Sequence, residues 1–237
     1  MPYKYILFLA MLFVTIDLAA VSVAYKMVAL NFLFEINSGA TFIFPITYAL
    51  GDVITEVYGY NMARKLIWFS LFLQFIFALL IIAIIHLPNP FFWKNEHAYI
   101  IVFGSILRFV SAGTVANIVS NFTNIYLVSK LKIPFEGKLF WVRSILSIII
   151  SGFLLVAIII IMGFSGQEIN FTKTWIMFKS TYLLEVIYAL ILVIPATLTA
   201  KFLKRVENVD VYDYNTNFNP FNFKSTSSVE PSVRLSH

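Results

Sequence analysis

The chain has 237 residues, of which 60% are hydrophobic and only 12% are charged, and its formal net charge is +5. A soluble domain carries about 25% charged residues, so this chain has too few to cover a water-facing surface. Cysteine is absent, which excludes disulfides, zinc–cysteine sites and a thiol nucleophile. Because each membrane span takes about 20 apolar residues, the length leaves little room for a separate catalytic domain.

Six apolar segments follow one another along the chain. They cover residues 5–25, 39–58, 66–87, 99–129, 144–164 and 175–203. The first is interpreted as a retained span, because it is long and no cleavage site follows it. In lipid only helices and closed barrels satisfy the backbone, and these segments exceed the roughly 10-residue strands of a barrel. We therefore predict an all-α polytopic membrane protein with about six transmembrane helices in residues 1–206 and a polar, cytoplasmic C-terminal tail in 207–237.

The second segment differs from the others because it contains Gly39, Pro45 and Gly51 together with two carboxylates, Asp52 and Glu56. Proline removes a backbone donor and clashes with the preceding turn, so we predict that this span is discontinuous. A broken span is tolerated only where the freed groups face protein or a watery cavity. Discontinuous helices of this kind often build the binding sites of transporters.

Asp52 and Glu56 are four residues apart, which places them on one face of a helix, about 6 Å apart along its axis. Ionisable groups inside a span are costly and usually face an interior cavity. The pair therefore indicates a site for a cation, a proton or an amidine-like ligand. The alternative is that both carboxylates lie at the cytoplasmic end, solvated or paired with Arg64 and Lys65.

The fourth segment carries a helical stripe of small and polar residues. The stripe comprises Gly113, Asn117, Ser120, Asn121 and Asn124. Amide groups both donate and accept hydrogen bonds, which suits a heterocyclic ligand. Hydrogen bonding between helices explains the stripe equally well. Near the broken second segment, Phe44 and Tyr48 are candidates to stack on a planar ligand.

Five further charged residues lie within or at the edge of the spans. Asp17, midway along the first segment, is expected to be a buried partner of Arg108 or Lys179. Lys179 lies near the outer interface, where a lysine can snorkel, so we favour a structural role for it. Glu185 lies deeper, and we favour a functional role there. Arg143, at the start of the fifth segment, is a candidate for a structural or coupling role.

The distribution of Lys and Arg predicts that both termini are cytoplasmic. In that orientation twelve of the 17 basic residues lie on the inner side, namely Lys4, Arg64, Lys65, Lys130, Lys132, Lys138, Arg143, Lys201, Lys204, Arg205, Lys224 and Arg234. The outer side has three, namely Lys26, Lys94 and Lys173. Topology thus accounts for the positive net charge, and a nucleic-acid partner is not needed to explain it.

Three stretches resemble the queuosine precursor transporter family, also called the vitamin uptake transporter or YhhQ-like family. The first runs from Phe44 to Gly59, with Phe-Pro-Ile-Thr, the Asp52–Glu56 pair and Val-Tyr-Gly, and is followed by Ala63-Arg64-Lys65. The second comprises Gly137, Lys138, Trp141, Arg143 and Ser147. The third comprises Lys179, Pro195, Val209 to Asp213 and Asn219-Pro220-Phe221. The three lie in order and together cover most of the chain.

The resemblance implies six spans in the cytoplasmic membrane and uptake of 7-cyano- or 7-aminomethyl-7-deazaguanine, precursors in a tRNA modification pathway. A guanine-like edge presents a ring N–H beside an exocyclic amino group, and one carboxylate can accept both. Glu56 or Asp52 would be that acceptor, with an aromatic residue over the ring face.

The sequence departs from the family in the fourth and fifth spans, where the family often shows a Gln-x-x-Asp pattern. Here the matching positions hold Asn121 and Asn124 in the fourth span, and Gly152 and Leu155 in the fifth. The departures leave the exact substrate and the coupling ion open.

We therefore predict an importer of a queuosine precursor rather than an enzyme, with no cofactor and no metal site. Its partners are the small-molecule substrate and membrane lipid, and a homo-oligomer remains open. The substrate contacts are expected from Phe44, Tyr48, Asp52, Glu56, Asn117, Asn121, Asn124 and Glu185, and structural or coupling roles from Asp17, Arg108, Arg143 and Lys179. One alternative is a substrate-binding membrane subunit for another small heterocycle or vitamin, energised by a separate ATPase, since no Walker-type phosphate loop is present. The other is a non-transporting membrane scaffold.

Overall fold

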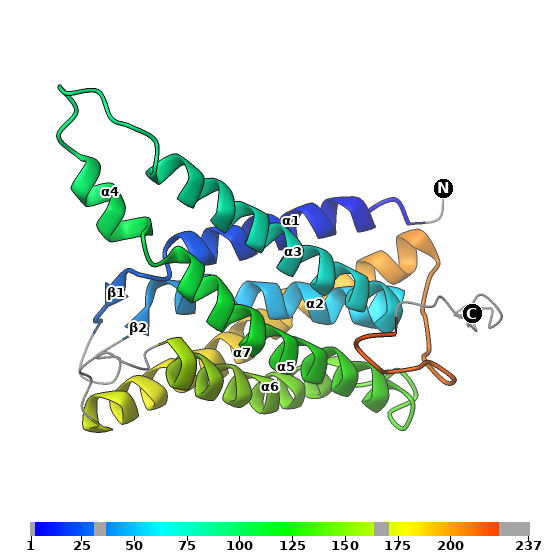
Figure 1. Ribbon diagram of the computed structural model, residues 1–237. Coiled ribbons are helices and arrows are strands. Elements are labelled where there is room, and N and C mark those ends of the chain that lie inside the picture. The colour runs from blue at the N-terminus through cyan, green and yellow to red at the C-terminus, as the bar shows by residue number, and fades with distance from the viewer. Residues whose placement is uncertain (1–2, 31–36, 164–170, 223–237) are drawn as a thin grey trace.

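The computed structural model describes residues 3–30, 37–163 and 171–222, and nearly all of its regular structure is helical. The helices are α1 (Ile6–Ser22), α2 (Pro45–Tyr58), α3 (Tyr60–Ile85), α4 (Glu96–Phe103), α5 (Ile106–Lys132), α6 (Phe140–Gly163) and α7 (Phe171–Glu207). A 3₁₀ turn, η1 (Gly39–Phe42), precedes α2, and two short strands, β1 (Met27–Val28) and β2 (Asn37–Ser38), pair antiparallel. Figure 1 shows the long helices packed into one bundle.

The two ends of this bundle differ, and we name them by what they contain. At the terminal end α1 begins and α7 ends, and the backbone N–H of Tyr5 donates to Glu207 at 2.7 Å. The strand end, opposite to it, contains β1 and β2 (Figure 1). The first and last helices of the chain therefore have their outer termini on the same side of the bundle, as an even number of crossings requires.

The helix lengths account for about six crossings. In the described chain four helical segments are long and apolar enough to span a membrane: Tyr60–Ile85, Glu96–Lys132, Phe140–Met162 and Phe171–Glu207. Helix α1 has 17 residues and is therefore about 25 Å long. Helix α2 has 14 residues, about 21 Å, and η1 extends it to about 30 Å, the thickness of a bilayer core. The structure thus confirms the predicted all-α membrane fold.

The second span is discontinuous, as predicted, but the break lies before Pro45 rather than within the helix. Pro45 occupies the first position of α2, where the backbone N–H has no helical partner to lose and the fixed φ favours helix initiation. The preceding turn, η1, ends at Phe42. Pro45 therefore starts the helix, and the irregular backbone lies on its strand-end side.

Several boundaries differ from the sequence prediction. The predicted fourth span is divided at Gly104 and Ser105 into α4 and α5. Helix α4 has no buried residue, and Figure 1 shows that it projects from the bundle together with the end of α3. Helix α3 begins at Tyr60, before the apolar run, because its first turns pack against protein rather than lipid. The predicted boundary at residue 206 lies one residue before the end of α7 at Glu207.

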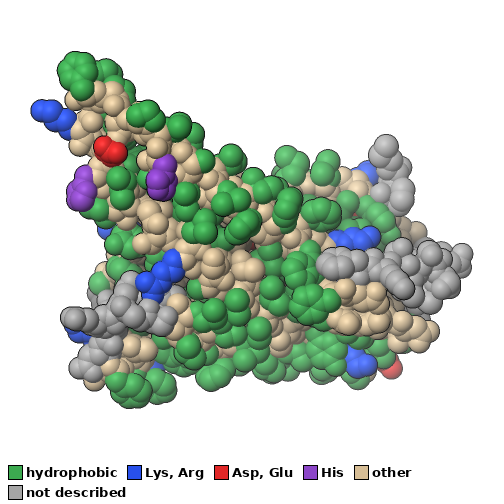
Figure 2. All heavy atoms as spheres, viewed as in Figure 1, with side chains coloured by type: hydrophobic (Ala, Val, Ile, Leu, Met, Phe, Trp, Pro, Cys, Tyr) green, Lys and Arg blue, Asp and Glu red, His purple; other side chains and the backbone are tan. Residues whose placement is uncertain are grey.

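Helix α2 is the centre of the bundle. Eleven of its 14 residues are buried, and it packs against α1, α3, α5, α6 and α7. The outer helices instead expose many large apolar side chains, and hydrophobic side chains cover most of the face seen in Figure 2. Such exposure suits lipid, so the polar residues of α2 must find their partners inside the protein.

Residues 208–222 follow α7 and fold back against the start of α3. The Tyr60 hydroxyl donates to the Phe218 carbonyl at 2.7 Å, and the Trp68 indole N–H donates to the Pro220 carbonyl at 2.9 Å. Arg64 donates to the Asn219 carbonyl at 3.0 Å. The proximal tail is therefore bound to the bundle, while residues 223–237 lie outside the described residues.

Candidate functional site

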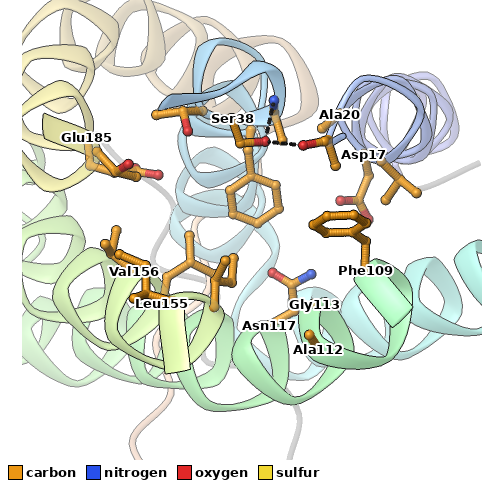
Figure 3. A pocket seen from close by; sticks show the side chains of 18 of the residues that line it. Asp17, Ala20, Ser38, Phe109, Ala112, Gly113, Asn117, Leu155, Val156 and Glu185 are labelled. Carbon is orange, nitrogen blue, oxygen red and sulfur yellow. Dashed lines mark hydrogen bonds between the residues drawn. The ribbon is translucent and has the colours of Figure 1, made fainter. Parts of the chain in front are cut away.

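A cavity of about 100 Å³ lies inside the bundle, toward the strand end. Its lining comes from α1, η1, α3, α5, α6 and α7 and is mostly apolar. Four helices each contribute one carboxyl or amide side chain to it: Asp17, Gln74, Asn117 and Glu185. Figure 3 shows the two carboxyl groups on opposite sides of the cavity, with Asn117 on a third side. A largely apolar pocket with a few convergent polar groups is typical of a small-molecule site.

The Asp17 side of the cavity offers an acceptor next to a donor. The Asp17 carboxylate is buried and accepts a hydrogen bond from the Ser70 hydroxyl of α3. Gln74, one turn further along α3, lies beside Asp17. Its amide is close enough to act on the Asp17 carboxylate as a weak donor, but its buried Nε2 makes no hydrogen bond of normal length among the described residues. A buried donor without a partner costs about 1–3 kcal/mol, so this side is suited to a ligand that donates to Asp17 and accepts from Gln74.

The Glu185 side is built differently, because this carboxyl lacks polar support. Glu185 is 2% exposed, and its Oε2 has no hydrogen-bond partner within the described part of the chain. On α6, Gly152 faces it: a Cβ added at Gly152 would lie 3.7 Å from the Glu185 Cβ. The glycine thus presents only its Cα, and no side-chain donor, to Glu185. A carboxylate without partners is strongly disfavoured in an apolar interior, so the neutral acid fits this environment.

An aromatic pair borders the same cavity. Phe44 lines it, just before α2, and contacts Tyr48 edge-on with ring centroids 5.4 Å apart. Tyr48 is 1% exposed and lies one turn further along α2. Across the cavity, the Asn117 Oδ1 accepts a hydrogen bond from Asn121 at 3.3 Å. Phe44 is therefore placed to cover the face of a planar ligand, with Tyr48 behind it.

Asp52 lies one turn beyond Tyr48 on α2 and is fully buried. Its two carboxylate oxygens each accept a hydrogen bond, one from the Asn124 amide of α5 and one from the Ser144 hydroxyl of α6. The Asn124 Oδ1 in turn accepts from the Ser151 hydroxyl at 3.3 Å. Asp52 is therefore held by polar groups between the cavity and the terminal end, and does not line the cavity itself.

Glu56, one further turn along α2, forms a buried bidentate pair with Arg143 of α6. The two guanidinium nitrogens donate to its oxygens at 2.9 and 3.1 Å. Lys204 of α7 donates to the same carboxylate at 2.6 Å. These partners differ from the Arg64 and Lys65 considered from the sequence. A planar guanidinium fits a carboxylate with two parallel hydrogen bonds, which adds specificity as well as energy.

The tail joins this pair. Lys132 of α5 donates to the backbone carbonyl of Glu56 at 2.6 Å and to Asp210 at 2.5 Å. Lys204 also contacts Asp210, at 2.9 Å. We call these five side chains the ionic network: Glu56, Lys132, Arg143, Lys204 and Asp210. It links α2, α5, α6, α7 and the tail, and contains three cations and two carboxylates.

Asp213 fastens the tail beside the ionic network. Its Oδ2 accepts hydrogen bonds from the backbone N–H of Tyr60 at 2.9 Å and from the Ser129 hydroxyl at 2.6 Å. At Gly59, between α2 and α3, φ is +83° and a Cβ would lie 2.7 Å from the Val211 side chain. Polar and charged contacts therefore fill the bundle at the terminal end, opposite the cavity.

The structure brings some of the predicted site residues together and separates others. Four line the cavity: Asp17, Phe44, Asn117 and Glu185. Four lie in the layer between the cavity and the ionic network: Tyr48, Asp52, Asn121 and Asn124. Glu56 and Arg143 belong to the ionic network. The predicted substrate contacts therefore follow α2 through successive levels of the bundle rather than surrounding one point.

The partner that the structure gives Asp17 is a hydroxyl group, where a basic residue was expected. Asp17 accepts from the Ser70 hydroxyl, and Lys179 lies over the Trp175 ring at 5.2 Å from its centroid. Arg108 is exposed on the first turn of α5. A neutral hydroxyl donor satisfies a buried carboxyl without burying a second charge, which explains why no basic residue is required there.

Several residues of the site were missed from the sequence. Gln74 is a polar residue in the middle of an apolar span, four residues after Ser70, and that spacing alone marks it as inward-facing. In the sequence, Lys132 and Lys204 indicate only the cytoplasmic side of the membrane. Asp210 was noted within a family motif, but no local pattern connects it with Glu56, 154 positions earlier in the chain.

No group of three or more His, Cys, Asp or Glu side chains suitable for a metal ion is found in the described residues. The chain matches the family described as "putative vitamin uptake transporter" over residues 38–200, which is more than half of its length. No curated protein and no solved structure matches it. The match includes α2, α5, α6 and most of α7, which carry Asp52, Glu56, Arg143 and Glu185. The chain therefore belongs to the vitamin uptake transporter family, as its sequence motifs predicted, and is a multi-pass membrane protein of a transporter family.

Proposed function

We propose that the protein imports a 7-deazaguanine precursor of queuosine across the cytoplasmic membrane. The observation that carries this proposal is the cavity, in which a buried acceptor, Asp17, lies beside a buried donor, Gln74, that makes no hydrogen bond of normal length among the described residues. Membership of a transporter family supports flux of a small molecule rather than catalysis. The queuosine precursor itself comes from the resemblance of the sequence motifs.

The two side chains match the hydrogen-bonding edge of a guanine-like base. That edge presents an amino group, a ring N–H and a carbonyl oxygen in a row, and a carboxylate can accept from the first two. Asp17 would accept these two donors, and the Gln74 Nε2 would donate to the adjacent carbonyl. Phe44 would cover the ring face. A purine-like ring bearing no amino group would leave part of the Asp17 acceptor unused and should bind more weakly.

The ionic network at the terminal end of the bundle supports the interpretation that this conformation is closed toward the cytoplasm. We propose that the terminal end faces the cytoplasm, because most Lys and Arg residues lie at that end of the spans. In this orientation the cavity lies toward the outside and the ionic network closes the inner route. Release of the substrate would require the network to open, after which Asp52 and Glu56 would meet the substrate along its path. This arrangement is alternating access around the discontinuous second span.

Uptake of labelled precursor by cells that lack their own synthesis tests this proposal. We expect uptake with the parent protein, reduced uptake at low substrate concentration in Asp17→Asn, and a loss of uptake in Asp52→Asn and Glu56→Gln. Each variant should still insert into the membrane. The family description names vitamins, so a parallel assay adds an excess of unlabelled vitamins and measures whether they compete with the labelled precursor for uptake. Competition by a vitamin but not by unlabelled precursor, or normal uptake in all three variants, would refute the proposed substrate and site.

Reporter fusions test the orientation separately. A reporter at Lys94, between α3 and α4, should report an external location, and one at Pro134, between α5 and α6, an internal location. The reverse pattern would overturn the charge argument while leaving the cavity unaffected.

A further inference from the structure

Glu185 is the one carboxyl group of the cavity that has no role in the proposed recognition of the base. It lies across the cavity from Asp17, and its Oε2 is unpartnered among the described residues. The Gly152 backbone on α6 packs against its stem, with a built Cβ 3.7 Å from the Glu185 Cβ. A carboxyl that is buried, faces a cavity and lacks donors is stable as the neutral acid, and it becomes stable as the anion only where water or a cation reaches it.

The charged and ionisable groups around Glu185 leave it without a counter-ion. Asp17 on α1 is the other ionisable group of the cavity lining, in the part of the chain that the structure describes. From α2, the Tyr48 hydroxyl lies within the electrostatic field of Glu185. Asp52, also on α2, is bound by Asn124 and a serine hydroxyl. Each of these groups is acidic, so none of them compensates a negative charge on Glu185.

The basic residues of the neighbouring helices are bound elsewhere or lie at the surface. On α7 itself, Lys179 lies over the Trp175 ring. On α6, Arg143 is bound to Glu56 in the ionic network. Arg108 on α5 is exposed at the start of its helix. The proton is therefore the cation that this position is suited to hold, and a proton on Glu185 also provides an O–H donor pointing at the cavity.

We infer that Glu185 is the site of a coupling proton and that the protein is a proton symporter, an inference that rests on the proposed function. A proton from the outer side binds the Glu185 carboxylate, and the neutral acid donates its O–H to an acceptor on the substrate, such as the nitrile of the 7-cyano compound. Asp17 holds the opposite, donor edge of the base. When the ionic network opens, water reaches Glu185, the proton leaves to the cytoplasm, and the substrate loses this hydrogen bond. One proton enters with each neutral substrate molecule.

The test uses the purified full chain in liposomes with labelled 7-cyano-7-deazaguanine. With the outside one pH unit more acidic than the inside, we expect the parent protein to accumulate the substrate about tenfold, because one coupled proton contributes that factor per pH unit. Addition of the substrate should also acidify the lumen, as read by a trapped pH dye. Glu185→Gln keeps the shape and an N–H donor but cannot release a proton. The exchange of labelled for unlabelled substrate that it supports, at whatever rate, should therefore not respond to the pH gradient and should give no accumulation.

Glu136→Gln is the matched control, because Glu136 pairs with Lys138 on the exposed surface and should behave as the parent protein does. Accumulation by Glu185→Gln equal to that of the parent protein would overturn the inference. Exchange by the parent protein with no response to the pH gradient and no acidification would also overturn it, whatever the variant does, while leaving the proposed function intact. Absence of all uptake and exchange by the parent protein would instead refute the proposed function and the inference together.

Discussion

Replacing Glu56 with Gln is expected to open the terminal end of the bundle. The ionic network contains three cations and two carboxylates, so Glu56→Gln leaves three cations facing Asp210 alone. Arg143 loses both of its carboxylate contacts while it remains fully buried. Removing one partner of a buried ion pair costs about 3–5 kcal/mol. Because 1.4 kcal/mol changes an equilibrium constant tenfold, the ratio of closed to open conformations should fall by a factor of roughly 100 to several thousand.

The absence of cysteine makes this shift measurable with a single introduced thiol. Ser147 lies one turn beyond Arg143 on α6 and is fully buried. Its hydroxyl has no hydrogen-bond partner in the described residues, so Ser147→Cys removes no side-chain hydrogen bond. In membrane vesicles that expose the terminal end, an impermeant thiol reagent should label this cysteine at least tenfold faster when Glu56→Gln is added. Labelling should be faster because opening of the ionic network lets water and the reagent reach the cysteine at position 147.

The surface pair of Glu136 and Lys138 provides the control. Both side chains are about three-quarters exposed, and exposed pairs contribute about 0–1 kcal/mol, so Glu136→Gln should leave the labelling rate unchanged. Equal labelling of the Glu56→Gln protein and its parent would refute the reasoning, because it would show that the network does not keep the terminal end closed.

Three further substitutions test other parts of the structure. Asp17→Asn replaces the acceptor with an amide, so the KM for precursor uptake should rise at least tenfold; an unchanged KM would remove Asp17 from the site. Asp213→Ala leaves the Tyr60 N–H and the Ser129 hydroxyl without their acceptor, at a cost of about 1–3 kcal/mol, so the thermal unfolding midpoint in detergent should fall by several degrees. Gly152→Ala adds a methyl at ordinary contact distance and should stabilise α6 by about 0.5–1 kcal/mol; a lower midpoint would contradict the packing against Glu185.

The membrane fold could be predicted because lipid imposes a simple requirement on long apolar segments. Each such segment must be helical to satisfy its own backbone, so the number and order of spans follow from the sequence. The details at Pro45 could not be predicted in the same way. Proline both ends and begins helices, and only the packing of α2 in the centre of the bundle makes Pro45 its first residue.

In the candidate site, too, some residues could be predicted from the sequence and others could not. The inward-facing residues of α2 were evident from their charge, since Asp52 and Glu56 have no favourable place in lipid. Their partners depend on how α5, α6 and the tail pack around α2, which local spacing does not encode. Lys204 illustrates this: by sequence it is one of several basic residues marking the cytoplasmic side, and in the structure it contacts both carboxylates of the ionic network.

Counterflow in liposomes tests the central claim most directly, because it requires only the protein and its substrate. The purified chain is reconstituted with unlabelled 7-cyano-7-deazaguanine inside and a trace of labelled compound outside, without ATP, a partner ATPase or an ion gradient. If the protein is a transporter of this compound, the label enters and rises transiently above its outside concentration, and Asp17→Asn lowers the rate. If the label stays outside while the reconstituted protein remains folded, the protein does not transport this compound by itself.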